Sequence, residues 1–485
     1  MRWLAQELEN NTLAFSIPKR PDHGQSDRRL NGAASPQSGL AFAVQAMALV
    51  IALSQFLAAQ TSLLPGKIDA VAVPSAPSAS VTGSGPERSS GAIAVSELVK
   101  EALAHNPSVI AARRNWQAAE QVPSQVSTLP DPEISVQQFS VGNPRPFAGF
   151  ITNNFAFVGF GISQDIPYPG KLRLRGEAAQ RRAASFREQG NSMRRSISEE
   201  VKAAYFRLAY SQQALTILQR DGKLIEQIEK IAEARYRVGQ GNQQDVLKAQ
   251  LQRTKILQEE EIQRQEIGSL EARLKQILNR PPDSPSITTE EMTETALPYT
   301  SDELLSLVRT RNPDVLTQQQ MVRSQSLQVE LARKDFYPDF NVQYMWQQTG
   351  PQFPNYYTLT FGVHVPIWRS RRQRPELAQA VEELNSSRHE YEAQVQQTYF
   401  EVQDQFVKAE TGARLLKIYR EGLIPQATAT FDAGLAAYQT GHEDFQTLLD
   451  SFLDVLNLNI EYWRTLASHE TALARLEQLT GVNFP

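Results

Sequence analysis

The side chains that could carry out chemistry in this sequence are its carboxylates, because the 485 residues include no cysteine. Glutamates cluster at residues 199–200 and 259–261, and paired carboxylates can act as general acid and base. Both clusters lie within long stretches of helical periodicity, where charge runs are normally solvated. No phosphate-binding loop and no H-E-x-x-H zinc motif accompanies them. The sequence therefore predicts a protein that is not an enzyme.

The histidines and the overall charge exclude further classes of function. None of the six histidines has a ligand spacing such as H-x-x-x-H, so we expect no metal site and no cofactor. The absence of cysteine excludes a disulfide framework, a thiolate nucleophile and lipid attachment through an N-terminal cysteine. The formal net charge of -4 shows no basic excess, so we expect no nucleic-acid partner.

The N-terminal part has the composition of a targeting segment. An apolar run at residues 40–59 follows Arg28 and Arg29 and precedes small residues, which predicts a secretory signal within residues 1–60 with an atypically long polar extension. The alternative is a membrane anchor, since about 20 apolar residues can cross a bilayer; polar residues inside the run favour the signal. Residues 61–92 are rich in Pro, Ser, Ala and Gly and are predicted to be a disordered linker.

From residue 93 onward the chain repeats itself at a shift of about 200 residues. The matches come in the same order in both copies, and such a repeat determines the architecture. They are Asn106-Pro107 with Asn312-Pro313, Pro130-Asp131 with Pro338-Asp339, Gly161-Ile162 with Gly362-Val363, Arg220-Asp221-Gly222 with Arg420-Glu421-Gly422, Tyr236-x-x-Gly239 with Tyr438-x-x-Gly441, and Leu247 with Leu449. We therefore predict two tandem repeats, residues 93–280 and 301–485, joined by a linker at 281–300.

Each repeat has the predicted order helix, strand, strand, long helix, helix. The first helices cover residues 95–127 and 301–336. Segments with alternating apolar and polar residues follow, bounded by Pro and Gly, and predict strands. These strands cover residues 133–141 and 155–166 in the first repeat, and 340–348 and 357–367 in the second.

The long helix of the first repeat covers residues 172–236, contains no proline and has a coiled-coil seam. At about 1.5 Å per residue it would reach roughly 100 Å, so it must pack side by side with other helices as a rod. A second helix returns over residues 242–278. The second repeat has the same order, with a predicted break at Gly422 and Pro425.

The four predicted strands indicate a membrane and an oligomer. They are too few to close a barrel, which needs about eight strands. Their length suits a tilted bilayer-spanning strand, and every strand edge must be closed in lipid. Several chains would therefore contribute four strands each to one barrel. The alternative is an ordinary four-stranded sheet packed on a helix.

These features resemble the TolC family of outer-membrane efflux proteins. The segments that carry the resemblance are ALAHNP and VRTRNP, the Pro-Asp steps before the strands, and the Tyr-x-x-Gly turns with the DVLKAQ and TLLDS that follow them. The resemblance implies a homotrimer with a twelve-strand barrel in the outer membrane and a long α-helical tunnel in the periplasm. It also implies a periplasmic adaptor and an inner-membrane pump of the RND type as partners. A coiled-coil structural protein of the envelope, without a pore, is the alternative.

The segment ISQDIPYPGKLRLR at residues 162–175 looks like the heavy-metal and small-cation branch of that family. That branch is often anchored through a lipidated cysteine, which this chain lacks, so the barrel and the surrounding outer-membrane lipid would provide the anchoring. Pro167, Pro169 and Gly170 would in any case turn the chain from strand to helix.

The resemblance also implies a constriction beside the second hairpin turn. The family's tyrosine falls on Tyr438 and its inner aspartate on Asp450, whereas Thr447 and Glu443 stand where the family has an aspartate and an arginine. We expect the Tyr438 hydroxyl to donate a hydrogen bond to a neighbouring helix, and a ring of Asp450 side chains to select against anions.

The two hairpin turns should also contact the adaptor. They are the most distal points of the predicted hairpins, and the resemblance implies that an adaptor docks there. The residues expected to meet it are Tyr236, Gly239, Gly241, Tyr438 and Gly441.

Overall fold

The computed structural model describes residues 92–350 and 352–484. The predicted signal at residues 1–60 and all but the last residue of the predicted linker lie outside the described residues. The first repeat contains α2 (Val95–His105), α3 (Pro107–Ala119), α4 (Val122–Ser127), β1 (Glu133–Phe139), β2 (Phe157–Ile166), α5 (Lys171–Arg237) and α6 (Gln243–Ile277). The second contains α7 (Ser301–Arg311), α8 (Pro313–Lys334), β3 (Asp339–Thr349), β4 (Tyr356–His364), α9 (Gln373–Ile418), η2 (Tyr419–Leu423), α10 (Ile424–Thr440) and α11 (Phe445–Thr480).

The first helix of each repeat is interrupted, so the prediction of single helices over 95–127 and 301–336 was wrong. Asn106 and Asn312 both adopt an extended backbone, with ψ of 124° and 121°. Each precedes a proline, which disfavours the helical conformation of the preceding residue. A second interruption at Glu120 and Gln121 separates α3 from α4.

At the predicted break around Gly422 and Pro425 the α-helix is interrupted, although the chain stays helical there. Residues Tyr419–Leu423 form one π-helical turn between α9 and α10. Pro425 lies in the first turn of α10, and the widened turn before it accommodates the proline's missing backbone donor.

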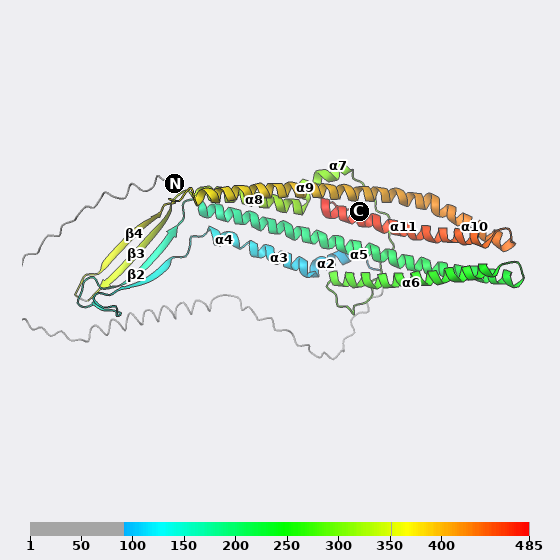
Figure 1. Ribbon diagram of the computed structural model, residues 1–485, viewed down its shortest axis with the longest axis horizontal. Helices are drawn as coiled ribbons and strands as arrows, with labels where there is room; N and C mark the ends of the chain where they lie inside the picture. Colours follow the sequence, from blue (N-terminus) through cyan, green and yellow to red (C-terminus); the bar gives the residue numbers. More distant parts are fainter. Residues whose placement is uncertain (1–91, 351, 485) are drawn as a thin grey trace, which may run out of the picture. The chain divides into compact units, whose positions relative to one another are not determined.

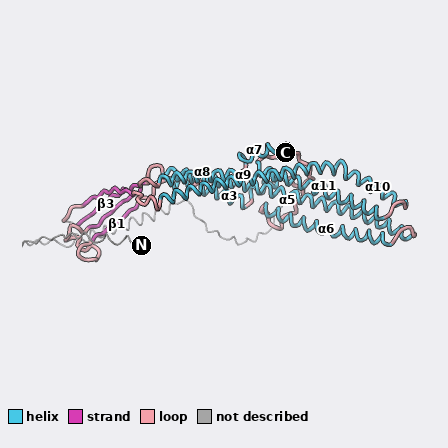
Figure 2. The backbone as a smooth tube through the Cα atoms, turned by 45° about the horizontal axis from the view of Figure 1, so that its top comes forward, coloured by secondary structure: helices cyan, strands magenta, loops and turns pink. Residues whose placement is uncertain are grey.

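The strands form a single four-stranded sheet in the order β1-β2-β3-β4, and every neighbouring pair is antiparallel (Figure 1). The β2–β3 pair joins the two repeats and runs from Phe157 opposite Thr349 to Ile166 opposite Phe340. Figure 2 shows that the sheet lies at one end of the helices and the hairpin turns lie at the other end.

Helix α5, with 67 residues, is the central element of the helical part. It packs against α6, α8 and α11, and α9 packs against α8 and α11. The predicted seam is buried, as Val201, Leu208 and Ile225 have no exposed surface. The core continues to the hairpin turns, where Tyr438 and Phe445 join the same apolar cluster as Ile225.

Candidate pore and hairpin turns

The sheet has one predominantly apolar face. Alternate residues of a strand share a face, and directly opposed residues on neighbouring strands also share a face. Val136 opposes Phe160, which opposes Trp346, which opposes Tyr357. Its other apolar members are Ile134, Val158, Ile162, Ile166, Phe340, Val342, Tyr344, Leu359, Phe361 and Val363, and its polar members are Gln138, Gln164 and Gln348. The side chains on β4 are strongly exposed, with Phe361 at 72%.

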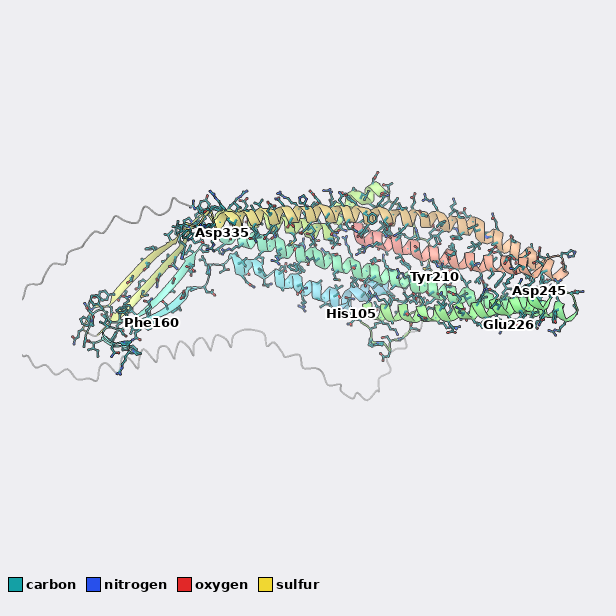
Figure 3. The ribbon with its side chains drawn as sticks, viewed as in Figure 1. His105, Phe160, Tyr210, Glu226, Asp245 and Asp335 are labelled. Carbon is teal, nitrogen blue, oxygen red and sulfur yellow. The ribbon has the colours of Figure 1, made fainter. Side chains whose placement is uncertain are left out.

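The opposite face is mostly polar or small, and its exceptions are Phe139, Phe157, Met345 and Tyr356. Gln137 opposes Gly159, which opposes Gln347, and Gln343 opposes Thr360. One face therefore suits hydrocarbon and the other suits water, which is the pattern of a transmembrane β-sheet. Figure 3 labels Phe160 in this sheet, with Asp335 where the strands meet the helices.

The two outer strands, β1 and β4, have no neighbour on one side within the described residues. Their free edges leave backbone donors and acceptors without strand partners, and such edges cannot persist in a bilayer. Among the described residues, none of the helices combines the length and apolar character that crossing a membrane requires.

At the other end of the helices, Tyr438 lies in the core instead of reaching a neighbouring helix through its hydroxyl. Its side chain is 2% exposed and packs edge to face on Phe445, with ring centroids 5.7 Å apart. The hydroxyl has no hydrogen-bond partner within the described residues. The expected donation from this hydroxyl is therefore not made in the single chain, because packing directs the ring inward. Burial raises the pKa of the Tyr438 phenol, and Asp245 raises it further.

Arg235 connects the two hairpins. The α5–α6 hairpin carries Arg235, whose guanidinium donates to the backbone carbonyl of Tyr438 and lies over the Tyr438 ring, 4.5 Å from its centroid. A second link runs from Lys248 Nζ to Gln446 Oε1 at 2.7 Å. Sequence reasoning missed Arg235, since the repeat matches it with Ala437 and so gave no paired signal.

The four expected constriction residues do not share one place. Tyr438 and Glu443 line a cleft of about 460 Å³ between the hairpin turns. Thr447 and Asp450 are exposed on α11 outside the set of residues that lines this cleft. The Asp450 carboxylate accepts a hydrogen bond from Gln446 at 2.8 Å, and the Thr447 backbone donates to Asp444, the N-cap of α11.

The turn glycines have different roles. Gly239 and Gly441 have φ of 75° and 80°, a region that favours glycine, so both are required to reverse the chain. Gly241 has no such angle; a Cβ there would lie 3.2 Å from Arg235 Cβ, so it allows close approach. Tyr236 is 48% exposed and Val238 is 69% exposed, which leaves apolar surface at the first turn.

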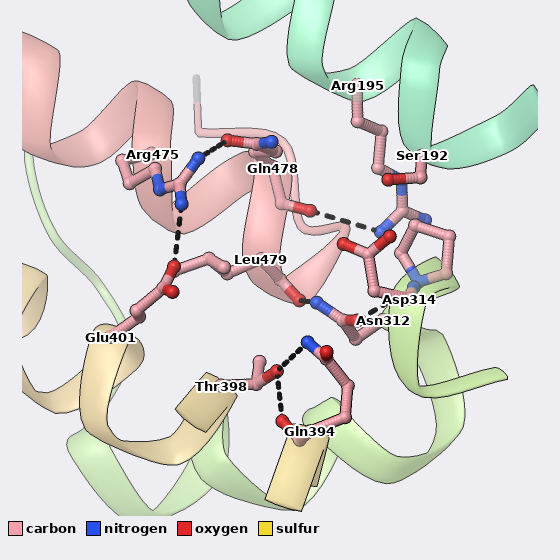
Figure 4. A pocket seen from close by; sticks show the side chains of 11 residues that line it. Ser192, Arg195, Asn312, Asp314, Gln394, Thr398, Glu401, Arg475, Gln478 and Leu479 are labelled. Atoms are coloured by element: carbon pink, nitrogen blue, oxygen red, sulfur yellow. Dashed lines mark hydrogen bonds and ion pairs between the residues drawn. The ribbon is translucent and has the colours of Figure 1, made fainter. Parts of the chain in front are cut away.

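A second pocket lies where α5, α7, α8, α9 and α11 meet (Figure 4). Its volume of about 80 Å³ is far below the roughly 300–1,000 Å³ of ligand sites. Its polar groups bind one another, as Arg475 contacts Glu401 at 2.6 Å and Arg195 donates to the Gln478 carbonyl at 3.4 Å. This pocket is a polar seam between helices. The described residues contain no group of three acidic, His or Cys side chains arranged to hold a metal.

Comparison with known proteins places these features in a family. Residues 98–280 and 304–482 match the family described as outer membrane efflux protein. Among solved structures, the outer membrane protein VceC from Vibrio cholerae is 18% identical over 81% of this chain and 97% of its own, with a TM-score of 0.70. CusC is 16% identical over 80% and 92% of the two chains, with a TM-score of 0.69.

The open-state outer membrane channel MtrE from Neisseria gonorrhoeae is 18% identical over 80% of this chain and 88% of its own, with a TM-score of 0.66. At these identities the structural likeness shows the fold. No curated protein sequence matches the chain. The family match and the shared fold confirm the resemblance drawn from the sequence.

Proposed function

The chain belongs to the outer membrane efflux protein family, and we propose that three copies of it form the exit duct of a tripartite efflux system. It is an outer-membrane channel, which settles the choice against a coiled-coil structural protein of the envelope. Each copy would contribute four strands to a twelve-strand barrel, with the helices forming a tunnel in the periplasm. The protein conducts cargo without transforming it, so no catalytic residue is assigned.

The two-faced sheet with open edges is the observation that carries this proposal. Strands β1 and β4 run antiparallel to one another, because the order β1-β2-β3-β4 alternates direction. The β4 edge of one copy can therefore pair with the β1 edge of the next and close an antiparallel barrel. Its apolar face then contacts lipid and its polar face lines the pore.

The helices leave apolar surface that suits contact between copies. Exposed apolar side chains follow α6 at Leu247, Leu251, Leu257 and Ile262. A second stripe follows α9 at Phe400, Val407, Leu415 and Ile418. Such stripes on helices far longer than a compact domain support side-by-side packing of copies into a tunnel wall.

The hairpin turns support a gate. Opening requires the α10–α11 hairpin to move away from the α5–α6 hairpin, and this motion breaks the contacts of Arg235 with Tyr438. Asp450 and Thr447 are exposed on α11 and would face the axis of the trimer. Three Asp450 carboxylates would repel one another there unless a cation lies between them. A bound cation would then favour the closed channel, with Glu443 remaining in the cleft.

The same turns suit an adaptor, which only has to bind the open arrangement better than the closed one. Tyr236 and Val238 offer exposed apolar surface beside the turn glycines Gly239 and Gly241. The pump behind the adaptor would be of the RND type. The Pro-x-Pro-Gly-Lys segment and the similarity to CusC support heavy metals or small cations as cargo.

Native mass measurement of the detergent-extracted protein tests the assembly, and fractionation tests its place. We expect a trimer that fractionates with outer-membrane porins and conducts ions in planar bilayers. A stable monomer without conductance would contradict the proposal. The variant Leu251→Glu, on the α6 stripe, should weaken the trimer, whereas the exposed Lys255→Glu should leave it intact.

A further inference from the structure

The strand–helix junction between the two repeats is held by the buried ammonium group of a lysine. The Lys171 side chain, 4% exposed, lies at the start of α5, 2.9 Å from Asp335 and 3.0 Å from Asp339. Asp339 also accepts a hydrogen bond from the Tyr168 backbone at 2.7 Å. The connector from β2 to α5 is thereby fastened to the connector from α8 to β3. This contact joins the first repeat to the second inside one chain.

Two further strand–helix connectors, β4–α9 and α4–β1, lie beside the free edges of the sheet and carry charges without ion-pair partners among the described residues. The connector from β4 to α9 carries Arg369, Arg371 and Arg372, all exposed. The connector from α4 to β1 carries Asp131, which the repeat matches with Asp339, and it is also exposed. None of these four charges has an ion-pair partner within the part of the chain that the structure describes.

From this, and resting on the proposed trimer, we propose that the arginines of the β4–α9 connector bind Asp131 of the adjacent copy. The occupant of this surface is a second copy of the chain, because only the α4–β1 connector reproduces the Pro-Asp step that Lys171 recognises within the chain. The positive charges of the arginines meet the negative charge of Asp131 at the interface between adjacent copies. The arginine fork suits a carboxylate at such a site, as lysine does inside the chain.

The strand register agrees with this placement. Within the chain, Ile162 pairs with Tyr344. When the repeats are aligned on Gly161-Ile162 and Gly362-Val363, Val363 takes the position of Ile162. When they are aligned on the Pro-Asp steps, Val136 takes the position of Tyr344. Pairing Val363 with Val136 of the next copy keeps both on the apolar face, whereas a slip of one residue would put them on opposite faces. The same register brings the β4–α9 connector beside Asp131.

Charge exchange tests the ion pair through the temperature at which the trimer dissociates in detergent. Asp131→Arg alone should lower this temperature, and so should the triple change of Arg369, Arg371 and Arg372 to glutamate. Combining the two should restore most of the loss. Arg388→Glu, at an exposed position on α9 without a salt bridge in the structure, should have no effect. An unchanged dissociation temperature in Asp131→Arg, or no recovery of that temperature in the combined variant, would overturn the inference.

Cysteine cross-linking distinguishes a wrong arginine–Asp131 contact from a wrong trimer. The chain has no cysteine of its own, so Val136→Cys with Val363→Cys should form disulfides between copies and give a covalent trimer. The one-residue control Val136→Cys with His364→Cys should not. Cross-linked trimers that are indifferent to the charge exchange would reject the arginine–Asp131 contact and keep the proposed function. A protein that is monomeric in every variant would reject both.

Discussion

Asn106 and Asn312 make the same set of hydrogen bonds in the two repeats. Each Oδ1 atom accepts backbone N–H groups at the start of the next helix, from Ser108 in one case and Asp314 in the other. Each Nδ2 atom donates at 2.9 Å to a carbonyl at the end of the last helix of its own repeat, Ile277 or Leu479. One buried amide therefore closes each repeat on itself.

Replacing this amide should destabilise the repeat. For Asn312→Ala we expect a loss of about 1–3 kcal/mol, because the cap is removed and a buried carbonyl loses its donor. Chemical unfolding of the detergent-solubilised protein, followed by circular dichroism, would measure the loss. Asn115→Ala, at an exposed position on α3, is the control and should change little. Equal stability of the two variants would contradict the closing role.

Lys171→Met should destabilise the junction between helices and strands. Two carboxylates would lose their buried cation, and hydrogen bonds to charged groups contribute about 1.5–3 kcal/mol each. Because Asp335 and Asp339 remain 27% and 41% exposed, water would offset part of that loss. The thermal unfolding temperature is the measure. Lys230→Met, which removes a surface pair on α5, should have a much smaller effect.

Arg235→Ala should raise the open fraction of the channel. The variant loses both the bond to the Tyr438 carbonyl and the contact with the Tyr438 ring, so the hairpins are held together only by weaker contacts such as Lys248 with Gln446. Single-channel recording in planar bilayers measures the fraction. Arg237→Ala, which removes only an exposed pair with Glu233, should behave like the parent. A Tyr438→Phe change should have little effect, since the hydroxyl has no partner.

Asp450→Ala should remove block by divalent cations added on the periplasmic side. The exposed carboxylates of three copies would supply the charge that holds the cation. Conductance measured against cation concentration reports the block, and Asp302→Ala, at an exposed position on α7, serves as the control. Block of equal strength in Asp450→Ala would place the constriction elsewhere.

Glu470→Gln should flatten part of the dependence of stability on pH. Burial raises the pKa of Glu470, while hydrogen bonding with Thr295 and, to a smaller extent, His469 and Lys202 act in the opposite direction. The folded protein therefore keeps this proton to a higher pH than the unfolded chain does. Stability from this group is present at acidic pH and is lost as pH rises from the ordinary glutamate value through the raised one. The unfolding temperature of the variant should exceed that of the parent increasingly across this window and equal it below.

The sequence by itself determined the repeat and most of its elements, because both depend on local patterns. The boundaries of α5 and β2 lie within two residues of those predicted from the seam and from the alternation. Proline and glycine also marked the turns correctly at Gly239 and Gly441, where only a positive φ reverses the chain. The helix interruption at Asn106 is equally local, since the proline that follows disfavours the helical conformation there, although the sequence pattern predicts a single helix.

Only the tertiary structure decided which residues meet. Arg235 reaches Tyr438 across 203 positions, and Lys171 reaches Asp339 across 168. Neither contact leaves a periodic trace, since a single long-range partner does not repeat at helical or strand spacing. The inward packing of Tyr438 on Phe445 likewise depends on how two hairpins share one core. Local spacing determines the faces of helices and strands, whereas the pairing of those faces depends on the packing of the whole chain.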